Sequence, residues 1–299
     1  MRILVLGGTG YLGRHVAERL RALPGAHVLA AGRRTTADFA VDLAHDRPER
    51  LAGTLAAAAP DAVVNCAGAT AGDTVTLAEV NARGPAVLCA ALREAAPTAR
   101  LVHLGSAAEY GPGAPGVPAG ESAPACPVTP YGAAKLAGTL AVTSAALDAV
   151  VLRVGNPVGP GAPVASLPGR LAALLRPAGQ DPGAVLRLGD LSAHRDFVDV
   201  RDVSRAVESA VTTPAPLPPV LNISGGTAVP VREVAHGLAR HAGFRGRLEE
   251  TTGGSARSAP VSWQCSDVSA AARSLGWRPV HSLDEALAAL WAATTEPVP

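Results

Sequence analysis

The chain begins with RILVLGGTGYLG at residues 2–13, a short apolar run followed by closely spaced glycines. The run at 2–6 is typical of a parallel strand that is buried on both faces. Residues 14–23 have the pattern of a helix that ends at Pro24-Gly25. A glycine-rich turn between a strand and a helix presents backbone N–H groups at a helix N-terminus, where they bind phosphate. The stretch therefore predicts the first unit of a dinucleotide-binding fold.

The glycines follow the spacing GxxGxxG, and each has a predicted role. Gly7 permits the tight turn, Gly10 lets the backbone approach a pyrophosphate, and Gly13 lets the helix pack close to the strand. A plain glycine turn is the alternative, and the strand and helix on either side of the motif disfavour it.

Further apolar runs alternate with helical patterns through the first half of the chain. The expected strands lie at 27–31, 62–68, 101–104 and 150–154. This alternation predicts an α/β fold with a Rossmann-type, doubly wound parallel sheet and a smaller, mostly C-terminal substrate-binding domain.

The expected domain boundary lies near residue 156. Residues 1–156 are expected to form the cofactor-binding domain, and elements near 196–224 are expected to return to it. Residues 157–299 are expected to form mainly the substrate-binding domain, interleaved with the first. Proline and glycine are frequent between 157 and 183, which predicts short regular structure there and a part of a substrate lid.

The end of the second expected strand indicates the cofactor. Folds of this kind that use NAD usually carry an acid there, which binds the ribose 2′-hydroxyl. This chain has Arg33 and Arg34 instead, and guanidinium groups suit a 2′-phosphate. The pair predicts a preference for NADP(H), with NAD(H) possible and solvated surface arginines as the alternative. Asp42 lies where an adenine-binding carboxylate would follow the next short strand, and the small residues Ala67 and Gly68 leave space for a cofactor.

The stretch PYGAAK at 130–135 holds the residues with the clearest acid–base chemistry. Lys135 is the only lysine in the chain, and Tyr131 is one of three tyrosines. Residues four apart on a helix lie on the same face. An ammonium group near a phenol favours the phenolate by ~4 kcal/mol at 4 Å and an effective dielectric of 20. A surface Tyr–Lys pair is the alternative.

Composition excludes several classes of protein. The net charge is +1, with acids and bases dispersed, so no nucleic-acid partner is expected. The four cysteines and eight histidines show no metal-ligand spacing, so no metal is expected. No apolar run is long enough to span a bilayer, and the first residues lead directly into a strand, which leaves no room for a signal peptide. A cytoplasmic protein without a membrane partner is the expectation.

With these motifs, the chain resembles the extended short-chain dehydrogenase/reductase family, the NAD(P)-dependent epimerases, dehydratases and reductases of nucleotide sugars. The resemblance covers residues 2 to about 291 and includes LRVGNPVGPG at 152–161, HRDFVDVRDV at 194–203, LNISGG at 221–226 and LGWRPVHSLDEAL at 275–287.

The resemblance implies a role for each motif residue. Tyr131 resembles the catalytic acid/base, Lys135 the group that assists it and holds the nicotinamide ribose, and Ser106 the hydroxyl that orients the substrate oxygen. Residues similar to cofactor contacts are Gly7, Gly10, Tyr11, Leu12, Gly13, Asp42, Leu43, Ala67, Gly68 and Asn81. Residues similar to nucleotide-diphosphate contacts are Asn156, Arg195 and Arg257.

Departures from the family's subgroups narrow the chemistry. The 4,6-dehydratases carry acidic residues just after the Ser106 position, whereas this chain has Ala107 and Ala108, which cannot move protons. The arginines after the second strand favour a reductase that draws on NADPH. The resemblance therefore implies reduction of the 4-keto group of a TDP- or GDP-activated 4-keto-6-deoxyhexose.

Three alternatives stay open: an NDP-hexose 4-epimerase that retains NAD, a reductase of a non-nucleotide ketone or aldehyde, and a non-catalytic NADP-binding member of the family. Members of this family commonly form homodimers, and the resemblance implies the same assembly as an expectation here.

Overall fold

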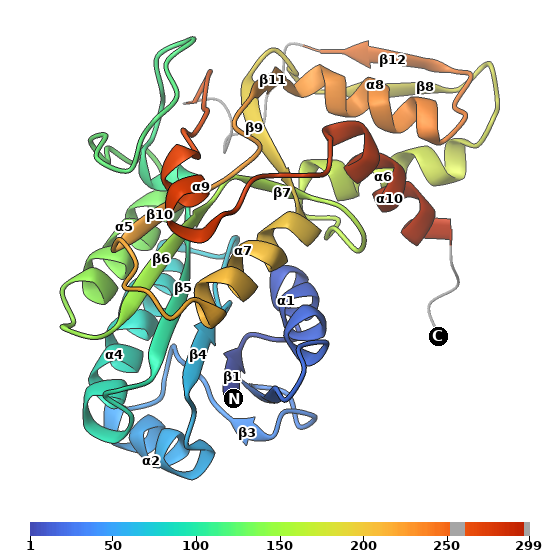
Figure 1. Ribbon diagram of the computed structural model, residues 1–299. Helices are drawn as coiled ribbons and strands as arrows, with labels where there is room; N and C mark the ends of the chain where they lie inside the picture. Colours follow the sequence, from blue (N-terminus) through green and yellow to red (C-terminus); the bar gives the residue numbers. More distant parts are fainter. Residues whose placement is uncertain (252–260, 296–299) are drawn as a thin grey trace.

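The computed structural model describes residues 1–251 and 261–295 (Figure 1). Within these residues, the largest feature is a seven-stranded sheet in the order β10-β6-β5-β4-β1-β2-β3, in which every pairing is parallel. Its strands are β1 (Arg2–Leu6), β2 (His27–Gly32), β3 (Phe39–Ala40), β4 (Ala62–Asn65), β5 (Arg100–Ser106), β6 (Ala149–Val154) and β10 (Val220–Ile223). The strand order reverses between β1 and β4, and ligands of such sheets bind at the carboxyl ends of the strands at this point. The predicted doubly wound α/β fold is confirmed.

Alternating side chains of each central strand pack on opposite faces of the sheet. In β1, Ile3 and Val5 join one buried cluster, whereas Leu4 and Leu6 join another. The first cluster is covered by α1 (Tyr11–Arg21), α7 (Val200–Thr212) and α9 (Ser269–Leu275); the second is covered by α2 (Pro48–Ala58), α4 (Gly84–Ala95) and α5 (Pro130–Thr143). Burial on both faces is the reason that these strands are continuously apolar.

The helical segment after β4 has three parts, which together run from Thr74 to Ala95. Asp73 caps a short helix, α3 (Thr74–Ala78), by accepting a hydrogen bond of 2.7 Å from the backbone N–H of Thr76. A π-helical turn, η1 (Glu79–Arg83), then leads into α4. Such turns interrupt helices at functional sites more often than elsewhere.

In the described ranges, the smaller part of the molecule contains two short sheets and three helices. These elements are grouped mainly at the upper right of Figure 1. One sheet has the order β11-β9-β7 and the other pairs β12 with β8. The helices and strands of this smaller part are β7 (Asn156–Val158), α6 (Leu167–Ala178), β8 (Val185–Leu188), β9 (His194–Asp199), β11 (Ala228–Pro230), α8 (Val231–His241), β12 (Arg247–Glu250) and α10 (Leu283–Thr295). Leucines of α6, α8 and α10 form its core.

Helix α6 contradicts the prediction of short regular structure between residues 157 and 183, because it has twelve residues. Ser166 caps its first turn by accepting from the N–H of Gly169, and Pro168 lies in that turn, where a missing N–H costs no hydrogen bond. Leu171 and Leu175 are buried one turn apart. Capping and burial outweigh the unfavourable composition.

The chain crosses between the two parts more than once. After β9, α7 packs against α1 and β10 pairs with β6 at the edge of the large sheet. The segment 261–267 then runs beside the loop that follows β5: Gly113 N–H donates to the carbonyl of Trp263 at 3.0 Å, and Ala119 N–H donates to that of Cys265 at 2.9 Å. No helix within 1–251 or 261–295 is both long and apolar enough to cross a membrane.

Candidate active site

The glycine loop between β1 and α1 has the shape of a phosphate cradle. Gly7 has φ +74°, and a Cβ on it would lie 2.7 Å from Ala67 Cα, so side chains are excluded where the β1 and β4 loops meet. Gly10 is the N-cap of α1 and supplies no side-chain hydrogen bond to the first turn. A Cβ on Gly13 would lie 2.1 Å from the carbonyl oxygen of Gly7. The backbone N–H groups of an eleven-residue helix therefore face an uncluttered loop, which fits a pyrophosphate.

Tyr11 and Leu12 have packing contacts in the structure. The Tyr11 hydroxyl donates to the carbonyl of Gly159 at 3.3 Å, and burial raises the pKa of this tyrosine. Leu12 packs against the buried cluster beneath α1. The Tyr11 side chain joins α1 to the loop at 159–161. The predicted role of both residues in cofactor binding stays a prediction.

The two arginines after β2 are exposed at the edge of the sheet. Among residues 1–251 and 261–295, neither the Arg33 nor the Arg34 guanidinium has a hydrogen-bond or ion-pair partner. The nearby carboxylate of Asp38 is engaged elsewhere, because it accepts a hydrogen bond of 2.7 Å from the backbone N–H of Ala30. Two guanidinium groups are thus available to an anion next to this strand.

The turn that follows β3 is fixed by hydrogen bonds to its backbone. Asp42 accepts from the Ala44 N–H at 3.1 Å. Arg83, which sequence reasoning missed, donates to the carbonyls of Leu43 at 3.3 Å, Ala44 at 2.8 Å and Asp46 at 2.9 Å. Arg83 therefore holds Asp42 and Leu43, the predicted adenine contacts, against the π-helical turn.

Asn81 holds the loop after β4. Its side chain is buried, accepts from the Ala69 N–H at 3.1 Å and donates to the Ala69 carbonyl at 2.8 Å. A Cβ on Gly68 would lie 3.2 Å from Asn81 Oδ1, and one on Gly138 of α5 would lie 2.2 Å from the Asn81 carbonyl oxygen. This chain of close contacts joins the glycine loop, through Ala67 and Gly68, to the helix that carries Lys135.

Ser106 lies at the carboxyl end of β5, and Tyr131 lies in the first turn of the adjacent α5. Ser106 Oγ accepts from the Ala108 N–H at 3.2 Å, which leaves its own hydrogen free to be donated. Thr129 caps α5 by accepting from the Gly132 N–H at 3.1 Å. Gly132 packs so closely that a Cβ on it would lie 2.5 Å from the Ala108 carbonyl oxygen. The structure thus brings the Ser106 turn against the turn that carries Tyr131.

Lys135 is buried one turn after Tyr131 and points at β5. Its Nζ donates to the carbonyl of Leu104 at 2.5 Å, two residues before Ser106. Burial lowers its pKa to about 8, and the charge of Glu109 partly opposes this change. A buried amine with a lowered pKa at the carboxyl end of a parallel sheet is typical of a functional group.

We expect the stability of the protein to depend on pH through Lys135. The folded chain has a Lys135 pKa of about 8, against an ordinary value of 10.5. Between these pH values the unfolded chain binds more protons than the folded chain, so stability rises with pH in this window. Urea unfolding of cofactor-free protein should show the wild type gaining about 3 kcal/mol relative to Lys135→Met between pH 7 and 10.5. A difference between the two that is independent of pH would contradict this assignment.

Two of the residues predicted to bind the diphosphate, Asn156 and Arg195, lie on neighbouring strands of the short sheet, β7 and β9. Asn156 Nδ2 donates to the Asp196 carbonyl at 3.0 Å across the β7–β9 pair. Arg195 is buried and donates to the carbonyls of His194 at 2.8 Å and Val261 at 2.6 Å. Arg195 therefore anchors the segment that returns to the active site. Arg257 lies outside the described residues.

Three buried polar residues near Ser106 were missed from sequence. Glu109 accepts from the Ser106 N–H at 2.7 Å, and Arg153 of β6 donates to Glu109 at 2.7 Å. Gln264 Nε2 donates to the Ala107 carbonyl at 2.9 Å. In the sequence, the only sign of their role was that each is a polar residue within an otherwise apolar segment or within a motif.

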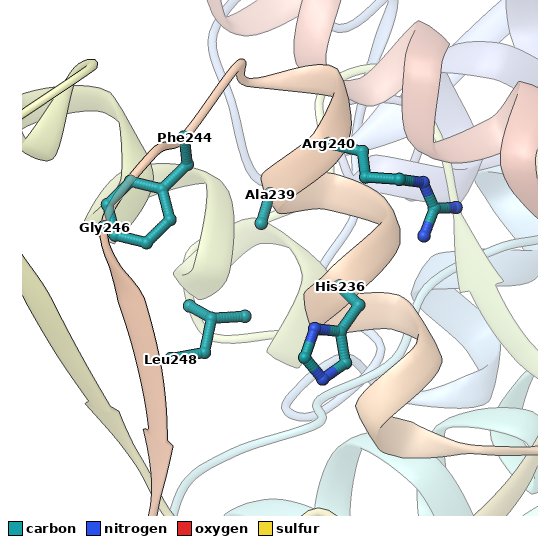
Figure 2. A pocket seen from close by; sticks show the side chains of 6 residues that line it. All are labelled: His236, Ala239, Arg240, Phe244, Gly246 and Leu248. Carbon is teal, nitrogen blue, oxygen red and sulfur yellow. The ribbon is translucent and has the colours of Figure 1, made fainter. Parts of the chain in front are cut away.

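A hollow at the outer edge of the smaller part is separate from this site. It is lined by residues of α8, of β12 and of the segment between them: His236, Ala239, Arg240, Phe244, Gly246 and Leu248 (Figure 2). None of the predicted site residues contributes to it. Within the described ranges, no group of three or more His, Cys, Asp or Glu side chains is placed to hold a metal ion.

Comparisons with known proteins agree with this geometry. The chain is 39% identical to a dTDP-6-deoxy-L-talose 4-dehydrogenase (NAD(P)(+)) of Kitasatospora kifunensis, over 99% of this chain and 97% of the relative. It is 26% identical to a dTDP-L-rhamnose 4-epimerase of Burkholderia thailandensis, over 54% of this chain and 44% of the relative. The solved structure of the UDP-glucose 4-epimerase of Thermus thermophilus, in complex with NAD, aligns with this chain over 100% of both chains, with a TM-score of 0.83 and 26% sequence identity.

A family model described as "NAD dependent epimerase/dehydratase family" matches residues 3–224. This match covers the glycine loop, Ser106, Tyr131 and Lys135, and it extends to the last strand of the large sheet. The chain belongs to the NAD-dependent epimerase/dehydratase family, the extended short-chain dehydrogenase/reductases that modify nucleotide sugars.

Proposed function

We propose that the protein catalyses the NADPH-dependent reduction of the 4-keto group of a TDP-activated 4-keto-6-deoxyhexose. The observation that carries the proposal is the similarity along the whole chain to an enzyme named as a 4-dehydrogenase of a dTDP-6-deoxysugar. Reduction of the 4-ketone is the reverse of that oxidation. The relative favours the TDP form over the GDP form of the substrate.

The residues present fit a bound dinucleotide. The glycine loop would hold its pyrophosphate, the turn at 42–46 its adenine, and Lys135 its nicotinamide ribose. When bound, the cofactor supplies the hydride that adds to C4 of the sugar.

The protein supplies the proton. We assign Tyr131 to give its hydroxyl proton to the carbonyl oxygen of the substrate, which becomes the C4 hydroxyl. The charged Lys135 stabilises the phenolate that remains, and solvent returns the proton to Tyr131. Ser106, whose oxygen already accepts a hydrogen bond from Ala108, donates its hydrogen to the same substrate oxygen. Ala107 is buried beside this site and carries no group that moves a proton, which argues against dehydration of the sugar.

Turnover tests the proposal directly. The protein is incubated with NADPH and TDP-4-keto-6-deoxyhexose, and the nicotinamide absorbance is followed. We expect oxidation of NADPH together with formation of a TDP-6-deoxyhexose, at a higher kcat/KM than with the GDP analogue. Absence of NADPH oxidation with both substrates would overturn the proposal.

A 4-epimerase is the second candidate, because two of the similar proteins carry that name. An enzyme of this kind oxidises and reduces the same carbon and keeps its cofactor through the cycle. Purified protein that contains bound NAD, and converts a TDP-hexose into its C4 epimer without added cofactor, would favour this candidate. A reductase should be isolated without stoichiometric cofactor and should require NADPH.

Replacing both arginines after β2 is expected to remove the preference for NADPH. In Arg33→Ser/Arg34→Ser, NADPH should bind about 10- to 100-fold more weakly, because hydrogen bonds to a charged group contribute about 1.5–3 kcal/mol. The affinity for NADH should change little. Fluorescence titration with both cofactors checks this, with Arg93→Ser as a control that also removes an exposed arginine. An equal loss for NADPH and NADH would contradict recognition of the 2′-phosphate.

A further inference from the structure

Glu109 is a carboxylate with no exposure to solvent at the centre of the candidate site. One of its oxygens accepts from the backbone N–H of Ser106 at 2.7 Å. The other accepts from the Thr139 hydroxyl at 2.8 Å and from Arg153 Nε at 2.7 Å. Desolvation strongly disfavours a buried carboxylate unless such hydrogen bonds offset it. Its presence here therefore calls for a role.

The three partners of Glu109 belong to three different elements. Ser106 ends β5, Arg153 lies on β6, and Thr139 lies on α5 one turn after Lys135. The carboxylate closes a capping box with Ser106 around the 3₁₀ turn at Ala107–Glu109. A Cβ on Gly105 would lie 2.7 Å from Glu109 Oε1, so the strand has a glycine where the carboxylate needs space. The Arg153 guanidinium is in turn held 4.5 Å from the centre of the Tyr110 ring.

The charges around Lys135 give this geometry a chemical consequence. Cys66 faces it from the end of β4 and His103 from β5, and Tyr131 lies one turn away on its own helix. Burial raises the pKa of Cys66 to about 12 and lowers the pKa of His103, so both are neutral near pH 7. Among the groups of the described chain that act on Lys135, Glu109 therefore supplies the negative charge that opposes its desolvation.

We propose that Glu109 is a positioning residue of this site. It holds Ser106 and helix α5 in place relative to each other, and its charge keeps the Lys135 ammonium group protonated next to the phenolate of Tyr131. The catalytic consequence rests on the function proposed above. The electrostatic role itself is a property of the folded protein without ligands. It predicts that Glu109→Gln, which keeps the shape of the side chain, makes Lys135 lose its proton at lower pH.

The single lysine of the chain allows this to be measured at one atom. Cofactor-free protein is produced with ¹³C-labelled lysine, and the ¹³Cε resonance of Lys135 is followed between pH 5 and 11. The wild type should titrate near pH 8. Glu109→Gln should titrate at least about one pH unit lower, because an opposite charge at close range moves a pKa by this amount or more. A midpoint equal to that of the wild type would overturn the proposal.

A matched control is provided by Asp202, another carboxylate with no solvent exposure and an arginine partner, Arg205 at 2.7 Å. It lies on α7, on the opposite face of the sheet from α5. Asp202→Asn should leave the Lys135 midpoint unchanged even if it lowers the stability of the fold. A midpoint lowered equally in both variants would mean that general loosening, and not the charge of Glu109, causes the change.

Two further arms keep the test decisive. If Glu109→Gln does not fold, the double variant Glu109→Gln/Arg153→Met is used, because it removes both charges of the pair and leaves no unpaired ion. Lys135 should also titrate at lower pH in this variant. A midpoint equal to that of the wild type would overturn the proposal. In turnover, Glu109→Gln should lose activity about one pH unit earlier on the alkaline side. Because the titration needs no substrate, an inactive wild type would defeat the proposed function alone, and an unchanged lysine midpoint would defeat this inference alone.

Discussion

Replacing Tyr131 by phenylalanine is expected to lower kcat by about 10²- to 10⁴-fold, the usual contribution of a positioned general acid. The substitution removes one oxygen from a partly buried side chain and leaves the Thr129 cap and the Lys135 hydrogen bond in place. The affinity for NADPH should therefore stay close to that of the wild type. Steady-state kinetics with TDP-4-keto-6-deoxyhexose and fluorescence titration of NADPH check the two halves of this expectation.

A double variant separates the proton donor from a merely nearby tyrosine. If Tyr131 and Ser106 act on the same substrate oxygen, Tyr131→Phe/Ser106→Ala should be hardly slower than Tyr131→Phe alone, because residues that act as a unit are not additive. Independent effects that multiply would argue against a shared oxygen. Near-normal turnover of Tyr131→Phe would remove the acid–base role entirely.

The fold could be predicted because its signals are local. The apolar run, the glycine turn and the helix of residues 2–21 are contiguous in the sequence, and each has a physical requirement that few other sequences meet. Burial on both faces of the sheet repeats the same apolar pattern in β4, β5 and β6. Tyr131 and Lys135 were also visible locally, because a helix places residues four apart on one face.

Contacts between distant segments could not be predicted in this way. Glu109 meets Arg153 across 44 positions, and Gln264 meets Ala107 across 157. No spacing rule relates such residues, since only the assembled sheet and the returning segment bring them together. Helix α6 was missed for another reason: capping by Ser166 and burial of its leucines outweigh a composition that disfavours a helix.

The proposed preference for NADP depends on fewer structural constraints than the fold does. Arg33 and Arg34 are exposed, and no packing requirement fixes where their guanidinium groups lie. The glycine loop and the buried Lys135 suit either dinucleotide, because both cofactors share the pyrophosphate and the nicotinamide ribose. Discrimination therefore depends on the least constrained residues of the site, which is why the arginine variants are the informative ones.

Gly13→Ala is expected to abolish cofactor binding and to lower the melting temperature by several degrees. The added Cβ would lie 2.1 Å from the Gly7 carbonyl oxygen and 2.9 Å from Gly8 Cα, so the backbone of the glycine loop must move. Overpacking of this kind costs about 1–3 kcal/mol, and 1 kcal/mol corresponds to about 2–4 °C in a protein of this size class. The displaced loop would no longer direct its N–H groups at a pyrophosphate.

Gly53→Ala is the matched control, because it makes the same substitution inside another helix, α2. A Cβ at this exposed position meets no atom within 4 Å. Alanine in an exposed helix interior stabilises by about 0.5–1 kcal/mol relative to glycine, so this variant should melt slightly higher than the wild type. Thermal melts with and without NADPH should show the ligand-induced rise in Gly53→Ala and none in Gly13→Ala. If Gly13→Ala kept that rise, the close approach of α1 to the loop would not be what shapes the cofactor site, and the phosphate would have to be held elsewhere.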